Sequence, residues 1–257
     1  MKICMYWMQQ AQRSRDNAAL LAAVSYAKRK NLALLIYFGL DVNYPEANER
    51  HFQFMLEGLA ELKAEFEEKA IPFYLVLEKP EVGMEAFLGF CEALFMDQGY
   101  LRHQREGRQK VREKAEKEGI RYIQEIETDL IIPIEEASIK EEYMARTIRP
   151  KLQRKVSDQL ALQHELTWEH EGLVAFAPEI KDKIDKELQL RKIRVIQDEL
   201  KQRESLLHLL ATLPIDHSVK GSPCFQGGYQ PAKKRLEDFV KNKLADYDQS
   251  GSPEFDL

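Results

Sequence analysis

Cysteine is scarce in this sequence, with only Cys4, Cys91 and Cys224 among 257 residues. An odd number of widely spaced cysteines argues against a disulfide framework and a metal site, and favours reduced thiols in a cytoplasmic protein. Long apolar runs are also missing, because the richest stretch, 31–40, is far shorter than a membrane-spanning helix. The first residues lack the apolar core and cleavage site of a signal peptide. We therefore expect no contact with a membrane.

A basic excess is missing as well, because the formal net charge is −5. Proteins that grip DNA contact its phosphates through lysine and arginine, so a DNA-binding surface is expected to be basic. Either this chain does not bind nucleic acid, or the binding surface lies elsewhere. One basic cluster, 146–155, stands beside Glu141 and Glu142. Phosphate contact is one interpretation of the cluster, but local ion pairing or domain packing is the favoured one.

Several catalytic and cofactor motifs are absent. The six histidines do not cluster, and neither a His-Glu-x-x-His nor a Cys-x-x-Cys pattern occurs, so no zinc site is expected. The glycine-rich dinucleotide fingerprint, the phosphate-binding Walker loop and the nucleophile elbow of hydrolases are missing too. The residues alone therefore leave the chemistry open.

Short apolar runs alternate with amphipathic stretches in the first half of the chain. The runs at 3–7, 32–38, 73–77, 93–96 and 122–126 predict strands, and the stretches at 17–30, 49–69, 80–91 and 101–117 predict helices. Either Ser14 or Asp16 could cap the first helix. This alternation predicts an α/β fold, a Rossmann-like parallel five-stranded sheet with helices on both faces.

The pattern changes after about Pro133. We predict a charged, partly helical segment at 137–156, one long helix at 180–210, a last helix at 231–244, and no strand after 165. The helix at 180–210 has few apolar residues, so either much of it is exposed or it packs on something absent from this chain. These elements divide the chain into an α/β domain (1–155), a largely helical linker (156–222) and the beginning of an all-helical domain (223–257). 

Two loops are candidate ligand sites because they follow strands, and open α/β sheets bind ligands beyond the carboxyl ends of their strands. The first contains Gln9 and Arg13, although a capped helix start with an Arg13–Asp16 ion pair is the favoured interpretation. In the second, Tyr100 could stack on a planar ligand while Asp97 or Arg102 bonds its polar edge. An ordinary connecting loop explains this second sequence equally well.

Five stretches in order resemble one family, the class II cyclobutane-pyrimidine-dimer photolyases. They are YWMQ at 6–9 with QR at 12–13 and DNAAL at 16–20, RHFQFMLEGL at 50–59, EYMARTIRPK at 142–151, LPIDHSV at 213–219, and FQGGY at 225–229 with LEDF at 236–239. The resemblance covers most of the chain and thins between Trp168 and Leu210. At 127–129 the sequence ETD departs from the Asp and His-Asn pair usual in the family.

The resemblance implies an N-terminal domain that can hold a light-harvesting antenna, such as a deazaflavin or a folate, near Gln9, Arg13, Asp97, Tyr100 and Arg102. It implies a C-terminal helical domain that binds FAD and UV-damaged DNA, in which excited reduced FAD donates an electron that splits the dimer. Tyr247 matches a tyrosine that lines the flavin site. By this resemblance the 257 residues end before the phosphate loop of that site, so we expect the deoxyribodipyrimidine photo-lyase activity only of a longer protein.

Two alternatives stay open. The chain could be a free-standing module that binds an antenna chromophore or a partner protein, or it could belong to a cryptochrome-like photosensor. The last helix would lack neighbours in a fragment, so we expect fraying beyond about Phe239 and self-association through exposed apolar residues.

Overall fold

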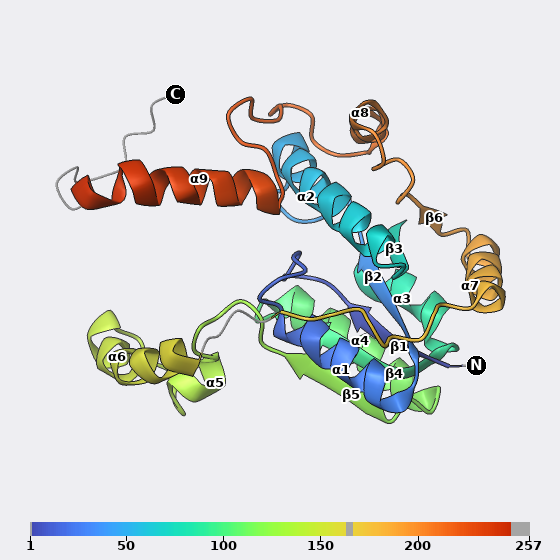
Figure 1. The fold of residues 1–257 in the computed structure, drawn as a ribbon, viewed down its shortest axis with the longest axis horizontal. Coiled ribbons are helices and arrows are strands. Elements are labelled where there is room, and N and C mark those ends of the chain that lie inside the picture. Colours follow the sequence, from blue (N-terminus) through green and yellow to red (C-terminus); the bar gives the residue numbers. More distant parts are fainter. Residues whose placement is uncertain (1, 163–166, 248–257) are drawn as a thin grey trace.

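The computed structural model describes residues 2–162 and 167–247, with the side chains of 157–162 left out. A six-stranded sheet in the order β5-β4-β1-β2-β3-β6 forms its centre (Figure 1). Five strands run parallel to one another, namely β1 (Ile3–Trp7), β2 (Ala33–Gly39), β3 (Phe73–Leu77), β4 (Cys91–Asp97) and β5 (Tyr122–Ile126). The predicted α/β fold with five parallel strands is therefore confirmed.

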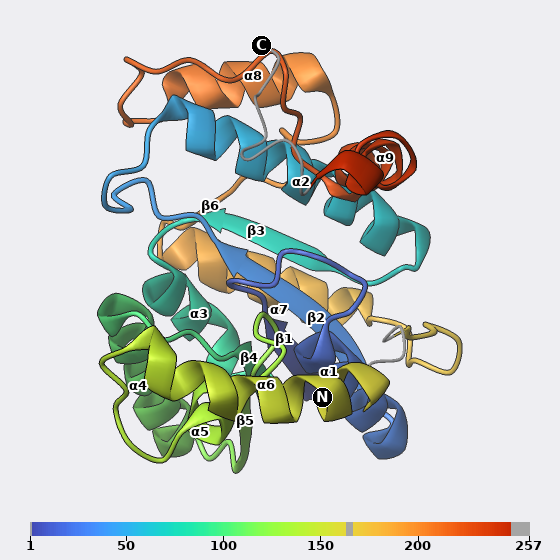
Figure 2. The same ribbon diagram turned by 90° about the vertical axis from the view of Figure 1, so that its left-hand side faces the viewer.

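Helices cover both faces of the sheet (Figures 1 and 2). On one face lie α1 (Ala18–Lys30), α2 (Glu49–Glu68) and α8 (Arg203–Thr212), which share a core with Tyr6, Ile36 and Phe95. On the other lie α3 (Pro80–Leu88), α4 (Arg102–Lys117) and α7 (Pro178–Leu190), around Trp7 and Tyr37. Because both faces are covered, nearly every residue of the central strands is buried, as expected for parallel sheets.

The first helix starts at a residue that differs from our prediction. Asn17, and neither Ser14 nor Asp16, caps α1, and its side-chain oxygen accepts a hydrogen bond from the Leu20 amide at 2.9 Å. Asn31 ends the helix in the left-handed conformation, with φ of 54°, which asparagine tolerates better than most residues. The third helix also ends earlier than predicted, because Cys91 already belongs to β4.

The largest correction concerns 180–210, which is not one helix. Helix α7 ends at Leu190, Lys192 takes a left-handed φ of 58°, and strand β6 (Arg194–Val195) follows. Strand β6 pairs antiparallel with the β3 edge, which contradicts the prediction of no strand after 165. The segment packs on the sheet of this chain and not on something absent from it, because Ile184 and Leu188 on α7 are buried there one helical turn apart.

The remaining helices lie outside these two layers. Helices α5 (Ile134–Ala137) and α6 (Ala145–Leu162) pack on each other and stand away from the sheet in Figure 1. Helix α9 (Tyr229–Asn242) has no buried residue and is followed by the 3-10 turn η1 (Leu244–Asp246).

In the described part of the chain, no helix has the length and apolarity to cross a membrane. The domain limits at 155 and 222 stay a prediction.

Segment 213–220 is held against the start of α2 by a charged cluster. Glu49 is nearly buried, and its Oε2 lies 2.6 Å from Nδ1 of His217 and 2.8 Å from Nζ of Lys220. The other ring nitrogen of His217 lies 3.0 Å from the Leu213 carbonyl oxygen. The hydrogen bond to Glu49, and after it the one to the Leu213 carbonyl, raises the pKa of His217. Lys220 and His217 in turn lower the pKa of Glu49.

This cluster predicts that segment 213–220 loosens as the pH rises. A raised histidine pKa contributes stability that is complete below about pH 6.5 and is lost as the pH passes the folded value. Amide exchange of 213–220, corrected for intrinsic rates, should therefore be faster at pH 8 than at pH 6. In the variant His217→Gln the difference should disappear, and an unchanged pH dependence in that variant would refute the assignment.

Candidate functional site

A cavity of about 730 Å³ opens at the edge of the sheet where β1, β2, β3 and β4 end. Ligands of α/β sheets bind at this edge, and ligand cavities typically measure roughly 300–1,000 Å³. The lining mixes apolar, amide, aromatic and charged side chains from the loops that follow the strands and from α2, α3 and α4. It includes Trp7, Met8, Gln9, Gln10, Gln12, Phe38, Leu40, Asp41, Tyr44, His51, Phe52, Met55, Lys79, Pro80, Glu81, His103 and Gln104.

Three lining residues carry buried polar atoms without a hydrogen-bond partner among the described residues. They are the indole Nε1 of Trp7 and the amide oxygens of Gln9 and Gln10. Buried polar groups in folded proteins are nearly always paired, and an unpaired one costs free energy. The residues of the cavity lining therefore include one donor and two acceptors for which the described residues supply no partner.

Close contact between β2 and α3 shapes one side of the cavity. A Cβ atom built on Gly39 would lie 2.5 Å from Cα of Pro80, so only glycine fits at the end of β2. The Tyr37 hydroxyl donates to the Pro80 carbonyl oxygen at 2.9 Å and fixes the same approach. The position of Pro80 in the lining thus depends on residues of the neighbouring strand.

Asp97 does not line the cavity, but it bonds the backbone of the loop that carries Gln9. Its side chain is fully buried, and Oδ1 accepts from the Tyr6 hydroxyl at 2.7 Å. Oδ2 accepts from the backbone amides of Gln9 at 2.8 Å and Ala11 at 3.0 Å. Burial raises the pKa of Asp97 to about 6, although the three hydrogen bonds act in the opposite direction. The carboxyl group thereby fixes the loop that carries Gln9.

Asn17 completes this network from the start of α1. Its amide nitrogen donates to the Tyr6 hydroxyl at 2.8 Å and to the carbonyl oxygens of Ala11 at 3.2 Å and Arg13 at 2.9 Å. The loop between β1 and α1 is therefore held by buried bonds from two other elements. Because the backbone of this loop is already ordered, ligand binding would cost less conformational entropy.

Arg13 lies outside the cavity lining. Its guanidinium forms an ion pair with Asp129 at 3.1 Å and donates to the Asp16 carbonyl oxygen at 3.2–3.3 Å. The ion pair expected with the Asp16 carboxylate is thus replaced by one to the loop after β5. In that loop the Glu127 carboxylate accepts from the backbone amides of Thr128, Asp129 and Leu130. The residues at 127–129 that depart from the family pattern therefore form a loop in which Glu127 bonds the backbone amides, and Asp129 pairs this loop with Arg13.

Tyr100 and Arg102 do not line the cavity either. The Tyr100 hydroxyl donates to a carboxylate oxygen of Glu135 on α5 at 3.1 Å. Desolvation is the main cause of the raised pKa of Tyr100. Arg102 is 92% exposed and lies 4.0 Å from Glu106 along α4. The structure brings Gln9 and Asp97 together at the cavity loop and places these two residues elsewhere. Their role at a ligand stays a prediction.

Tyr247 follows η1 and is half exposed, with its ring edge-on to Phe239 at 5.6 Å between centroids. No residue of α9 is buried, and the cavity at the sheet edge does not include Tyr247. The described residues therefore do not enclose a flavin at this position, and its match to a flavin-site tyrosine stays a prediction.

The loop between β2 and α2 was not among the predicted ligand sites, yet it supplies Asp41 and Tyr44 to the lining. The Tyr44 ring lies edge-on to His103 at 5.3 Å between centroids, so two elements meet at the cavity. The signal that could have found this loop is positional, because it follows the second strand as the Gln9 loop follows the first. His103 ends the predicted loop after β4, but the sequence did not single it out as a ligand contact.

A mostly parallel sheet with helices on both faces defines an α/β fold, and the cavity at its carboxyl edge is a candidate ligand site. Residues 4–171 match the sequence model of the family described as DNA photolyase, and the chain belongs to this family.

Two curated relatives are both named deoxyribodipyrimidine photo-lyase. The protein of Methanothermobacter thermautotrophicus is 36% identical over 149 residues, which are 58% of this chain and 33% of the relative. The protein of Arabidopsis thaliana is 34% identical over 157 residues, which are 60% of this chain and 31% of the relative. The chain thus spans about a third of the length of these relatives.

Two solved structures share the fold. An archaeal photolyase from Sulfolobus tokodaii, described with two FAD molecules, matches with a TM-score of 0.63 and 19% identity over 93% of this chain and 47% of its own. A cryptochrome from Synechocystis sp. PCC6803 matches with a TM-score of 0.64 and 12% identity over 97% of this chain and 48% of its own. At these identities the two matches show a shared fold and no shared activity.

Proposed function

We propose that the chain is the α/β part of a class II deoxyribodipyrimidine photo-lyase, a light-dependent enzyme that splits cyclobutane pyrimidine dimers in UV-damaged DNA. The family match and the two relatives of that name support this proposal. When bound, reduced FAD would supply the excited electron that opens the dimer. Residues 1–257 should not repair DNA alone, because the described surroundings of Tyr247 do not enclose a flavin. Tyr247 is our candidate flavin contact in a longer protein.

The function that these residues themselves support best is the binding of a planar antenna chromophore, such as a deazaflavin or a folate, at the sheet edge. The observation that carries this proposal is the cavity with the three unpaired polar atoms of Trp7, Gln9 and Gln10. A conjugated ring system with carbonyl and N–H groups could pair these atoms, while Phe38, Phe52 and Met55 would contact its faces.

An absorbance spectrum and an intact mass of the same purified chain test the proposal. We expect a stoichiometric band in the near-ultraviolet or visible range, either as purified or after incubation with a deazaflavin or a reduced folate. In a longer protein with flavin, excitation of this band should sensitise flavin emission. A chain that stays colourless and shows no saturable binding of either chromophore would refute the antenna site.

The glutamine oxygens give the first mutational prediction. The double variant Gln9→Leu/Gln10→Leu should bind the chromophore about 5- to 30-fold more weakly, because two acceptors are lost at about 0.5–1 kcal/mol each. The control is Gln109→Leu, an exposed glutamine of α4 outside the cavity. Fluorescence titration measures both affinities. Equal affinities of the double variant and the control would exclude the glutamine oxygens as ligand contacts.

The free-standing module remains a second candidate, and one observation favours it. Every residue that lines the cavity lies between positions 7 and 107, so ligand binding requires no further domain. A gene that encodes these residues without a helical flavin domain, together with chromophore binding, would support this candidate over the repair enzyme.

Two expectations about the state of the protein belong to the same proposal. The exposed apolar residues Leu236, Val240 and Leu244 of α9 and η1 should promote self-association, which sedimentation of the chain at several concentrations would detect. We also propose a cytoplasmic location, in which the free thiols of Cys4, Cys91 and Cys224 stay reduced.

A further inference from the structure

The first turn of α2 has different neighbours on its two sides. On one side, His51 lines the cavity at the sheet edge, together with Ala47 from the preceding loop. On the other side, segment 213–220 lies against the same turn, where Asp216 forms a β-bridge with Asn48. The cavity and segment 213–220 therefore share one structural element, although they are far apart in the sequence.

Backbone hydrogen bonds fasten segment 213–220 to this turn. The amide of Glu49 donates to the carbonyl oxygen of Asp216 at 2.8 Å, and the amide of Arg50 donates to that of Val219 at 3.2 Å. Amides in the first turn of a helix have no acceptor within the helix itself. Segment 213–220 supplies these acceptors, so the position of the first turn depends on it.

The ring of His51 carries this dependence into the cavity. The backbone amide of Asn48 donates to Nδ1 of His51 at 3.1 Å. A ring nitrogen that accepts a hydrogen bond is unprotonated, so we assign the proton of the neutral ring to Nε2. Nε2 is then a donor with which a carbonyl group of a bound chromophore can pair. A displaced first turn would carry this donor out of position.

The charged cluster of Glu49, His217 and Lys220 strengthens the same attachment. Oε2 of Glu49 lies 2.6 Å from Nδ1 of His217, while Lys220 and Asp216 of the same segment also act on the charge of the ring. Because the pKa of His217 is raised, its ion pair is complete below about pH 6.5 and weakens as the pH passes the folded value. Segment 213–220 therefore holds α2 more firmly in mild acid.

We propose that segment 213–220 is a latch for the chromophore cavity, which holds the first turn of α2 in its binding position and makes the affinity depend on pH. The inference rests on the proposed chromophore binding and names how that site is regulated. Glu49, His217 and Lys220 act as positioning residues, because they lie outside the cavity lining. By linkage the latch and the chromophore stabilise each other equally, so bound chromophore should slow amide exchange of 213–220.

Fluorescence titrations of residues 1–257 with a deazaflavin and with a reduced folate, at pH 6 and pH 8, test the latch. The variant His217→Gln/Lys220→Gln should bind at least about fivefold more weakly than the wild type at pH 6. The ratio of the two affinities should be smaller at pH 8, because the wild-type histidine loses its proton as the pH rises. Other titrating groups at the cavity, such as Asp97 and His103, are the same in both chains and cancel in this ratio.

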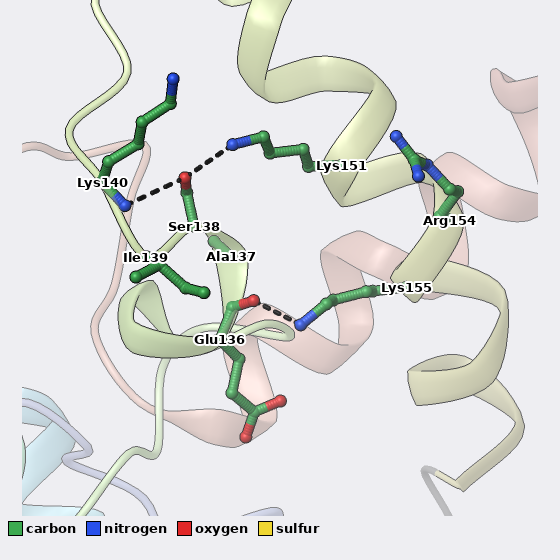
Figure 3. Close-up of a pocket in the computed structure, with 8 residues that line it drawn as sticks. All are labelled: Glu136, Ala137, Ser138, Ile139, Lys140, Lys151, Arg154 and Lys155. Atoms are coloured by element: carbon green, nitrogen blue, oxygen red, sulfur yellow. Dashed lines mark hydrogen bonds between the residues drawn. The ribbon is translucent and has the colours of Figure 1, made fainter.

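The control variant is Lys151→Gln/His208→Gln, which also removes one lysine and one histidine. Lys151 lies at a second cavity, between α5 and α6, where it donates to Ser138 Oγ at 2.9 Å (Figure 3). It thus joins two segments as Lys220 does, but away from the chromophore cavity. His208 is exposed on α8. The control should keep the wild-type affinity at both pH values, and circular dichroism verifies that both variants are folded.

Amide exchange without any chromophore separates the latch from the proposed function. At pH 6 the amides of 48–52 should exchange faster in the latch variant than in the control, because those of Glu49 and Arg50 lose their acceptors. Unchanged exchange at 48–52, or equal affinities of the latch variant and the control, overturns the inference. If the wild type binds neither chromophore, the proposed site fails and the effect on affinity with it, whereas the exchange result still decides whether 213–220 holds α2.

Discussion

Replacement of Asp97 by alanine is expected to lower the free energy of unfolding by about 3–5 kcal/mol, because it leaves three buried donors unpaired at about 1–3 kcal/mol each. These donors are the Tyr6 hydroxyl and the backbone amides of Gln9 and Ala11. The loop after β1 should lose its fixed position, so chromophore binding at the sheet edge should weaken together with stability.

Urea unfolding followed by circular dichroism measures this effect. The matched control is Asp182→Ala, which removes an exposed carboxylate on α7 and should change stability by less than about 0.5 kcal/mol. A loss of less than about 1 kcal/mol in Asp97→Ala would show that water or a rearranged loop replaces the carboxylate.

The same carboxyl group predicts a pH dependence with a defined sign. Its folded pKa of about 6 lies above the usual value near 3.8, so the folded state binds more protons than the unfolded state between these values. The stability of the wild-type chain relative to Asp97→Asn should therefore increase as the pH falls from 7 to about 4.5. A relative stability that decreases on acidification would mean that the hydrogen bonds outweigh burial.

The second large effect concerns α7. Leu188→Ala should cost about 2–5 kcal/mol, because a fully buried leucine is lost from the core and leaves a cavity. Leu188 packs with Ile184 in the core cluster that also contains Tyr37 and Phe87 of β2 and α3. The result would establish that a segment expected to be exposed or to pack on something absent stabilises the sheet.

Leu190→Ala is the matched control for this prediction, because Leu190 lies two residues away and is 79% exposed. Its loss should remain below about 0.5 kcal/mol. If both variants lost the same free energy, the register of α7 on the sheet would differ from the one described. The test needs only equilibrium unfolding of the two variants beside the wild-type chain.

The five parallel strands could be predicted because they are mostly apolar and the central ones are buried on both faces, whereas β5 at the edge is only partly buried. Strand β2 is the clearest case, with seven buried residues in succession. Strand β6 could not be predicted in this way. It has two residues, Arg194 is exposed, and the strand exists because Val195 pairs with Val76 at the free edge of β3. Nothing in a dipeptide encodes such pairing.

The candidate site was predictable in position and unpredictable in detail. The rule that ligands bind beyond the carboxyl ends of strands selected the loops of Gln9 and Asp97, which the structure brings together. It could not show that Asp97 turns inward to two amides while Tyr100 turns toward Glu135. The direction of a loop side chain depends on which distant partner is within hydrogen-bond reach, and that distance is a tertiary property.

The sequence by itself determined the alternation of strands and helices and, through motif order, the resemblance to photolyases, because periodicity and motifs are local along the chain. The tertiary structure alone decided that α7 belongs to the core, that Arg13 pairs with Asp129, and that the Asp97 carboxylate holds the amide of Gln9, 88 residues away in the chain. Burial and hydrogen-bond partners arise from contacts between distant segments, and such contacts exist only in the folded chain.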